Sequence, residues 1–269
     1  MEKLITTFPK MEEFEKAVSV FKELGIACEV ISPAPAYSKV GIPAVVIEAD
    51  GMRLISQRKS IDFICSGWVD YRQSLGKIPD SKPADFNEAI FADSAIMVLA
   101  PCVADHKKLR LIVHTSSNIE ESFPYLNAEL TTGTYTHEIK TFTFMDGYRI
   151  ISLYGHRLTL AKTDDIVDTW RVLEKIRCMV NEVWSRRSQI QPSYELKKKP
   201  PALEIYKRLP GSNCGACGQK TCMAFAMFLW NGEAHPSQCK PVFGGEYGHL
   251  KEPLMAICAG LGIAESEEV

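Results

Sequence analysis

The sequence lacks the features that mark a membrane protein, a secreted protein or a nucleic-acid-binding protein. Its 269 residues carry a formal net charge of −2, so no excess of positive charge indicates nucleic acid or an anionic membrane surface as a partner. No apolar run approaches the roughly 18 residues that a membrane-spanning helix needs. The first residues contain no long apolar stretch after a basic region, so we expect no secretory signal.

The common catalytic motifs are also missing. The chain contains no G-x-S-x-G nucleophile elbow, no P-loop, no G-x-G-x-x-G after a strand and no H-E-x-x-H. His114 and His137 lie in strand-like stretches, which favours structural roles for them. Asp164 and Asp165 precede a helical pattern, and a helix start explains them better than an acid–base pair. The sequence therefore predicts no substrate pocket.

Four of the nine cysteines lie in one short segment. Cys214, Cys217, Cys222 and Cys239 have the spacing C-x2-C-x4-C-x16-C. Four soft thiolates gathered in this way can hold a tetrahedral zinc ion or an iron–sulfur cluster. The first 200 residues show no paired cysteine framework, which favours a reducing cytoplasm over a disulfide-forming compartment.

The residues around these cysteines favour the cluster over zinc. Gly215 and Gly218 let the backbone curl tightly around an inorganic core, because they lack a Cβ atom. The apolar run MAFAMFLW after Cys222 predicts a short helix that would bury one side of the site. Zinc sites usually pair two C-x2-C knuckles or include histidine, whereas Cys239 stands alone and His235 is four residues before it. We predict one [4Fe-4S] cluster, with zinc or four unligated cysteines as the alternatives.

The same segment resembles a known domain. Residues 209–218 (LPGSNCGACG), followed by Cys222 and Cys239, are similar to the four-cysteine [4Fe-4S] domain of the corrinoid iron–sulfur protein large subunit and of the Rnf complex B subunit. The resemblance covers about residues 200–245. It implies that Cys214, Cys217, Cys222 and Cys239 are the cluster ligands and that the cluster transfers single electrons. The rest of the chain resembles neither protein and shows no corrinoid-binding barrel and no membrane anchor.

The other five cysteines are predicted to be mainly structural. Cys28, Cys178 and Cys258 fall in periodic segments, where cysteine acts as a small buried hydrophobic residue. Cys65 and Cys102 lie where an apolar run gives way to turn-forming residues, so either could be exposed and reactive. Nothing adjacent in the sequence lowers the pKa of either thiol.

Residues 1–108 are predicted to form an N-terminal α+β lobe with an irregular extension. A strand at 3–7, a helix at 10–24 and strands at 26–32 and 42–48 give the order β-α-β-β. This order is typical of a small α/β sandwich. We expect a docking or structural unit.

The extension gives a weaker pattern. Residues 60–75 have apolar side chains at helical spacing and predict a helix, although Gly67 weakens it. Residues 76–86 are polar and contain two prolines, which indicates a loop. The apolar run 89–102 fits a strand or a short buried helix, and periodicity alone does not separate the two.

Residues 109–187 are predicted to form a second α/β sandwich lobe with the order β-α-β-β-β-α. A strand at 110–116 precedes a helix that begins at Ser117 or Asn118. Asp146-Gly147 is a typical hairpin turn and predicts two strands around it. A second turn is expected at Gly155-His156. A long helix should run from Asp164 or Asp165 to about Arg187. This arrangement ahead of a four-cysteine domain resembles a group of anaerobe iron–sulfur proteins, which implies a fold but no reaction.

The end of the chain is predicted to be a linker and a cluster domain. Residues 188–201 are polar and contain the lysine run 197–199, which indicates a solvated tether or an electrostatic guide for an acidic partner. Residues 202–269 would form the small helical [4Fe-4S] domain, ending in an acidic tail. The expected fold class is therefore α+β: two small sandwich lobes followed by a helical cluster domain.

These features predict a cytoplasmic electron-transfer protein rather than a stand-alone enzyme. It would carry one [4Fe-4S] cluster and pass single electrons to a larger redox or corrinoid/methyl-transfer partner in anaerobic metabolism. Trp230 and His235 would shape the surface near the cluster, and no nucleic acid or membrane span is expected. The alternative is an iron–sulfur assembly protein or a redox- or oxygen-sensing module. The third class is an enzyme with its own substrate. It is the least favoured of the three, because four cysteine ligands leave no open coordination site for a substrate.

Overall fold

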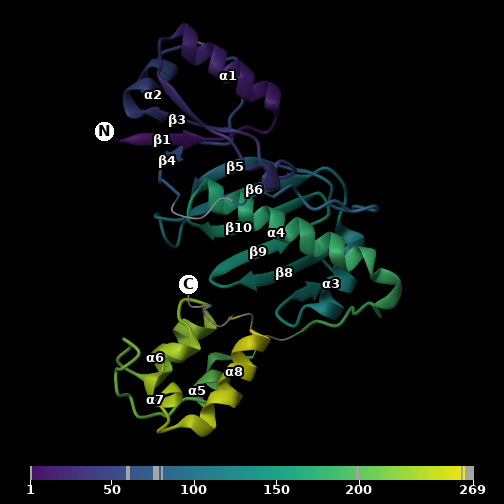
Figure 1. The fold of residues 1–269 in the computed structure, drawn as a ribbon, viewed down its shortest axis with the longest axis vertical. Helices are drawn as coiled ribbons and strands as arrows, with labels where there is room; N and C mark the ends of the chain where they lie inside the picture. Colours follow the sequence, from purple (N-terminus) through teal and green to yellow (C-terminus); the bar gives the residue numbers. More distant parts are fainter. Residues whose placement is uncertain are drawn as a thin grey trace.

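The computed structural model describes residues 2–58, 61–74, 79, 81–197, 200–261 and 263. It contains two antiparallel sheets with helices, followed by a helical C-terminal region, and the three parts succeed one another along the long axis (Figure 1). This confirms the mixed α+β class. Lys198, Lys199 and the acidic tail 264–269 lie outside the described residues, as does part of the predicted loop 76–86. None of the described helices has the length and apolar character required to cross a bilayer.

The N-terminal sheet has four strands in the order β2-β3-β1-β4. Its elements are β1 (Lys3–Thr6), α1 (Met11–Glu23), β2 (Cys28–Ile31), the 3-10 helix η1 (Pro35–Tyr37), β3 (Ala44–Glu48), α2 (Ala49–Ser56) and β4 (Val69–Asp70). Residues on β3 alternate between two cores: Val45 and Ile47 pack with α1 and α2, while Ala44 and Val46 face the rest of the molecule. The order β-α-β-β is as predicted, and α2 and β4 are additional.

The predicted helix over 60–75 is wrong. Its described residues, 61–74, contain no helix, and Val69–Asp70 form the short strand β4. Hydrogen bonds from distant parts of the chain hold the segment: the Ser66 N–H donates to the Thr7 carbonyl at 2.9 Å, and the Leu99 N–H donates to the Ser66 carbonyl at 2.7 Å. Gly67 has φ +123°, and a Cβ atom there would collide with the Leu99 carbonyl oxygen. Long-range pairing therefore overrides the local helical spacing.

The second sheet has six strands in the order β5-β6-β10-β9-β8-β7, and every neighbouring pair is antiparallel. The strands are β5 (Ser94–Pro101), β6 (Leu109–Thr115), β7 (Thr134–Thr136), β8 (Thr141–Asp146), β9 (Arg149–Leu153) and β10 (Arg157–Thr163). The run 89–102, for which a strand and a short buried helix were both open, contains the strand β5. Strand β7 is an additional strand that the predicted order β-α-β-β-β-α did not include. Strand β5 lies before residue 108 and β6 after it, so the six-stranded sheet extends across the boundary predicted between residues 108 and 109. The division of the chain into domains stays a prediction.

Both predicted turns are present. Asp146 pairs with Arg149 across the β8–β9 hairpin, and Gly147 takes the positive φ of +58° that such a tight turn requires. At the β9–β10 turn the Tyr154 N–H donates to the Arg157 carbonyl at 2.7 Å. The predicted helix start at Ser117 or Asn118 is wrong: the helical segment after β6 begins at Glu120, with Ile119 at its N-cap and no side-chain cap. The Asn118 Oδ1 accepts from the Glu120 N–H at 2.9 Å in the turn before it.

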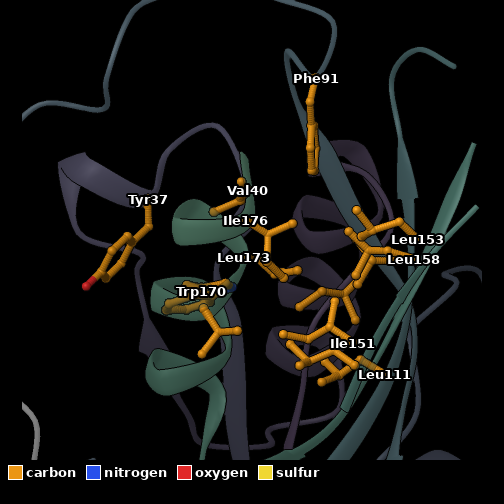
Figure 2. Close-up of a cluster of buried hydrophobic side chains, with 14 of the residues drawn as sticks. Tyr37, Val40, Phe91, Leu111, Ile151, Leu153, Leu158, Trp170, Leu173 and Ile176 are labelled. Carbon is orange, nitrogen blue, oxygen red and sulfur yellow. The ribbon is translucent and has the colours of Figure 1, made fainter. Parts of the chain in front are cut away.

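Helices cover one face of the six-stranded sheet. They are the 3-10 helix η2 (Glu120–Ser122), α3 (Phe123–Glu129), α4 (Ile166–Ser185) and the 3-10 helix η3 (Arg187–Gln189). Leu173 and Ile176 of α4 face the apolar side chains of the strands, and Trp170 lies on the side of the helix toward Tyr37 (Figure 2). Tyr37 and Val40 from the N-terminal part pack into the same core.

A buried ion-pair network fixes the start of α4. Asp165 caps the helix by accepting from the Val167 and Asp168 amides at 2.8 and 2.9 Å. Asp168, 7% exposed, accepts from Arg149 Nη2 at 2.8 and 3.0 Å and also from Arg171. Burial by itself raises the pKa of the Asp168 carboxyl, but its hydrogen bonds and the Arg149 charge outweigh burial and hold the pKa below its usual value. The network thereby attaches α4 to β9.

Replacing Asp168 with Asn should lower the free energy of unfolding at pH 7 by about 3 kcal/mol, because Arg149 would lose its buried counter-charge. A carboxyl with a depressed folded-state pKa stabilises the fold above its unfolded-state pKa of about 4, and this contribution is lost as the pH falls through the folded-state pKa. The difference from the native chain should therefore shrink below about pH 4. Urea denaturation followed by circular dichroism measures it. Asp50→Asn, in an exposed pair with Arg53, is the control, and an equal loss in both variants would contradict the network's importance.

Candidate iron–sulfur site

The C-terminal region has a hydrophobic core of its own. Its helices are α5 (Ala202–Tyr206), α6 (Cys222–Trp230), η4 (Pro236–Gln238), α7 (Lys240–Phe243), η5 (Gly248–Leu250) and α8 (Lys251–Gly260). Buried residues of α5, α6, α7 and α8 form one cluster separate from the cores of the two sheets. This region lies on the side of the six-stranded sheet where β8 and β9 are found (Figure 1).

The four predicted ligands come together. Cys214, Cys217, Cys222 and Cys239 all line one small cavity, which Phe225 and neighbouring loop residues complete. Among the described residues, no three or more His, Cys, Asp or Glu side chains are grouped to hold a single metal ion. The side chains of the four cysteines that line the cavity are thiols, the chemistry that iron–sulfur clusters take in proteins.

Backbone conformation brings three of these cysteines around the cavity. Asn213, Gly215 and Gly218 have φ values of +51°, +73° and +84°, which curl the loop before α6. Asn213 Oδ1 accepts from the Cys222 N–H at 2.8 Å, so the loop is tied to the first residue of α6. Thr221 caps that helix by accepting from the Ala224 N–H at 3.0 Å. The expected tight turn is therefore present, and Asn213 is a contributor that the sequence analysis did not single out.

The cysteines differ in exposure. Cys214 is exposed and Cys217 half-buried, whereas Cys222 and Cys239 are 8% and 5% exposed. Burial raises the pKa of the Cys239 thiol, the Val242 backbone amide lowers it, and the other three thiols raise it. Burial and the neighbouring thiols thus disfavour the Cys239 thiolate, and a positively charged group in the cavity, such as one containing several iron ions, would favour it.

The remaining cysteines do not reach this cavity. Cys258 is fully buried in the C-terminal core, and burial raises its pKa to about 11. Desolvation likewise raises the pKa of the half-buried Cys178 to about 11 and raises that of Cys28. Cys102 is 5% exposed, and Cys65 is half-buried. Cys102 is therefore not the exposed thiol that one interpretation of the sequence allowed.

Trp230 and His235 have structural contacts. Trp230 Nε1 donates to the Pro200 carbonyl at 2.8 Å, which anchors the entry to the C-terminal region. His235 and Gln238 cap the 3-10 helix η4 reciprocally. The His235 side chain accepts from the backbone N–H of Gln238, and the side-chain Oε1 of Gln238 accepts from the backbone N–H of His235 at 3.1 Å. These contacts give both residues a role in local folding.

The C-terminal region touches the six-stranded sheet through polar contacts that the sequence did not reveal. Lys162 Nζ pairs with Glu233 Oε1 at 3.1 Å. Gly232, at φ +71°, lies against the β8–β9 turn so closely that a Cβ atom would collide with the Gly147 carbonyl. Lys197 donates to the Asn127 and Leu130 carbonyls at the end of α3. The expectation of a solvated lysine run is therefore wrong for Lys197.

Comparison with known proteins finds similarity in this C-terminal region. A family described as "FeS: Putative Fe-S cluster" matches residues 209–241. The gamma subunit of the acetyl-CoA decarbonylase/synthase complex of Methanopyrus kandleri is 42% identical over 66 residues, which are 24% of this chain and 14% of that protein. The corrinoid/iron-sulfur protein large subunit of Moorella thermoacetica is 60% identical over 37 residues, which are 14% of this chain and 8% of that protein. No solved structure matches.

The chain thus shares a C-terminal iron–sulfur domain with these proteins, as the sequence resemblance implied. The matches span only 8% and 14% of the two relatives' lengths. The similarity to the Rnf subunit stays a prediction.

Replacing Cys222 with Ser should remove the cluster or convert it to another cluster type, because one of the two buried cysteines would no longer supply a thiolate. We expect the iron and sulfide content and the visible absorption of anaerobically reconstituted protein to fall at least about twofold. Cys258→Ser is the matched control, since it makes the same change in the same core without touching the cavity. Far-UV circular dichroism should show both sheets retained in both variants. Equal iron loss in both would argue against ligation by Cys222.

Proposed function

We propose that the chain is an electron-transfer protein that holds one [4Fe-4S] cluster on Cys214, Cys217, Cys222 and Cys239. The convergence of these four thiols on one cavity carries the proposal. The bound cluster would supply a one-electron redox couple. The residues of the chain hold the thiolates in place, exclude water on the side of Phe225, and leave the side of Cys214 open to solvent.

The asymmetric burial supports electron transfer over a purely structural role. The buried pair, Cys222 and Cys239, is fixed by helix starts, since Cys222 opens α6 and Cys239 immediately precedes α7. The exposed loop around Cys214 brings the site to the surface, where a second redox centre could approach closely. A purely structural site would gain nothing from this exposure.

The partner we propose is a larger redox or corrinoid/methyl-transfer protein of anaerobic metabolism, reached in the cytoplasm. Support comes from the relatives, whose names describe a subunit of the acetyl-CoA decarbonylase/synthase complex and a corrinoid/iron-sulfur protein. Similarity to both stops at the cluster region, so the two sheets would be the part specific to this chain. In this view they act as docking lobes, with the C-terminal region attached to them as a separate small domain.

The second candidate is a sensor or an iron–sulfur assembly protein. The exposure of Cys214 also favours this function, because oxidants would reach the rim of the site directly. Reversibility separates the two candidates. An electron carrier keeps its iron through repeated redox cycles, whereas a sensor or an assembly protein releases it.

Anaerobically purified protein should contain about four iron and four acid-labile sulfides per chain and give an EPR signal on dithionite reduction. Repeated cycles of reduction and reoxidation should leave the iron content unchanged. Metal analysis, sulfide assay and electrochemistry check these outcomes. One zinc without sulfide would end the electron-transfer proposal, and loss of iron in the first cycle would favour the sensor or assembly function.

A further inference from the structure

Helix α6 is apolar on all sides. Its nine residues, CMAFAMFLW, include no charged side chain. One face, with Cys222, Phe225, Ala226 and Leu229, packs into the C-terminal core. A helix without a polar face is normally buried all round. The other side of α6 therefore presents apolar surface that the described chain does not cover.

This outward face consists of Met223, Met227 and Phe228, which are 38%, 43% and 38% exposed. It begins next to Cys222, so it adjoins the cavity lined by the four cysteines. Leu203, on the helix α5 that packs against α6, is also exposed. Exposed apolar residues gathered on one surface mark protein-interaction sites, and methionine adapts its shape to different partners.

The chain segment that contains α6 and the four cysteines carries more positive than negative side chains. Residues 209–243 contain three Lys, Arg, Asp or Glu side chains: Lys220, Glu233 and Lys240. Glu233 is paired with Lys162. Lys220 and Lys240 are exposed, and neither forms an ion pair with another residue that the structure describes. They lie two residues before Cys222 and one residue after Cys239, so two cations flank the site.

We propose that the outward face of α6 is the docking surface for an acidic redox protein. Met223, Met227 and Phe228 would contact an apolar patch beside the partner's redox centre, and Lys220 and Lys240 would face its carboxylates. This rests on the proposed electron-transfer function and adds the place and chemistry of the partner. One electron passes between the two proteins, one being oxidised and the other reduced, with no bond formed or broken.

An acidic bacterial ferredoxin, kept oxidised so that no electron moves, serves as the probe for binding. The M223Q/M227Q variant of the cluster-loaded chain should raise the Kd measured by calorimetry about tenfold, because nearly isosteric polar groups replace the apolar contact. M223L/M227L should restore binding. K220Q/K240Q should weaken binding and reduce its salt dependence. L196Q changes an exposed apolar residue that lies outside both sheets and outside the outward face of α6, and its Kd should be unchanged.

Other outcomes overturn the proposal in recognisable ways. An unchanged Kd in M223Q/M227Q, with normal reversible reduction by methyl viologen, would reject the docking surface but not the electron carrier. Failure of the native chain to be reduced reversibly by methyl viologen would reject the proposed function itself. Equal binding of the basic protein cytochrome c would reject the charge argument. A dimer in sedimentation that M223Q/M227Q converts to monomer would assign the face to a second copy of the chain.

Discussion

Four thiols held around one small cavity form the constraint on which the C-terminal region depends. Burial is the main reason that the pKa of the Cys239 thiol is raised, and repulsion from the three neighbouring thiols raises it further. The fold opposes this repulsion with rigid backbone: a loop curled at Asn213, Gly215 and Gly218, and helices that begin at or directly after a cysteine. The arrangement is therefore costly unless a positive centre lies between the sulfurs. With the proposed cluster bound, folding of the region would be coupled to binding of that cluster.

The sheets supply a platform with a different physical basis. Their stability comes from a large apolar core and from buried pairs such as Asp168–Arg149, none of which involves the cysteine cavity. The two parts meet through the Lys162–Glu233 pair and the close approach of Gly232 to the β8–β9 turn. Gly260 and Leu261 also line one cavity with residues of β8 and β9, so the cluster region borders the sheet at more than one place. The chain thus combines an iron–sulfur domain shared with other proteins and two antiparallel sheets.

The site was more predictable from the sequence than the fold around it. Cysteine spacing and the neighbouring glycines are local signals, so the gathering of the four thiols and the curled loop could be anticipated. The misassigned segment 60–75 depended instead on hydrogen bonds to Thr7 and Leu99, which are remote in sequence. Strand β5 was ambiguous for the same reason, because its neighbour β6 decides its conformation. The contact of Lys197 with the end of α3 also depends on tertiary packing that composition does not reveal.

The core that Tyr37 and Val40 share with Trp170 has a consequence for how the chain can be divided. Ile5 and Val46 of the N-terminal sheet belong to the same buried cluster as Leu173 and Ile176 of α4. Cutting the chain between the two sheets would expose apolar surface on both fragments and favour their aggregation. The two sheets should accordingly melt as one cooperative unit. Recombination or shortening of such a protein would be tolerated best on the C-terminal side of α4, where the buried cluster ends.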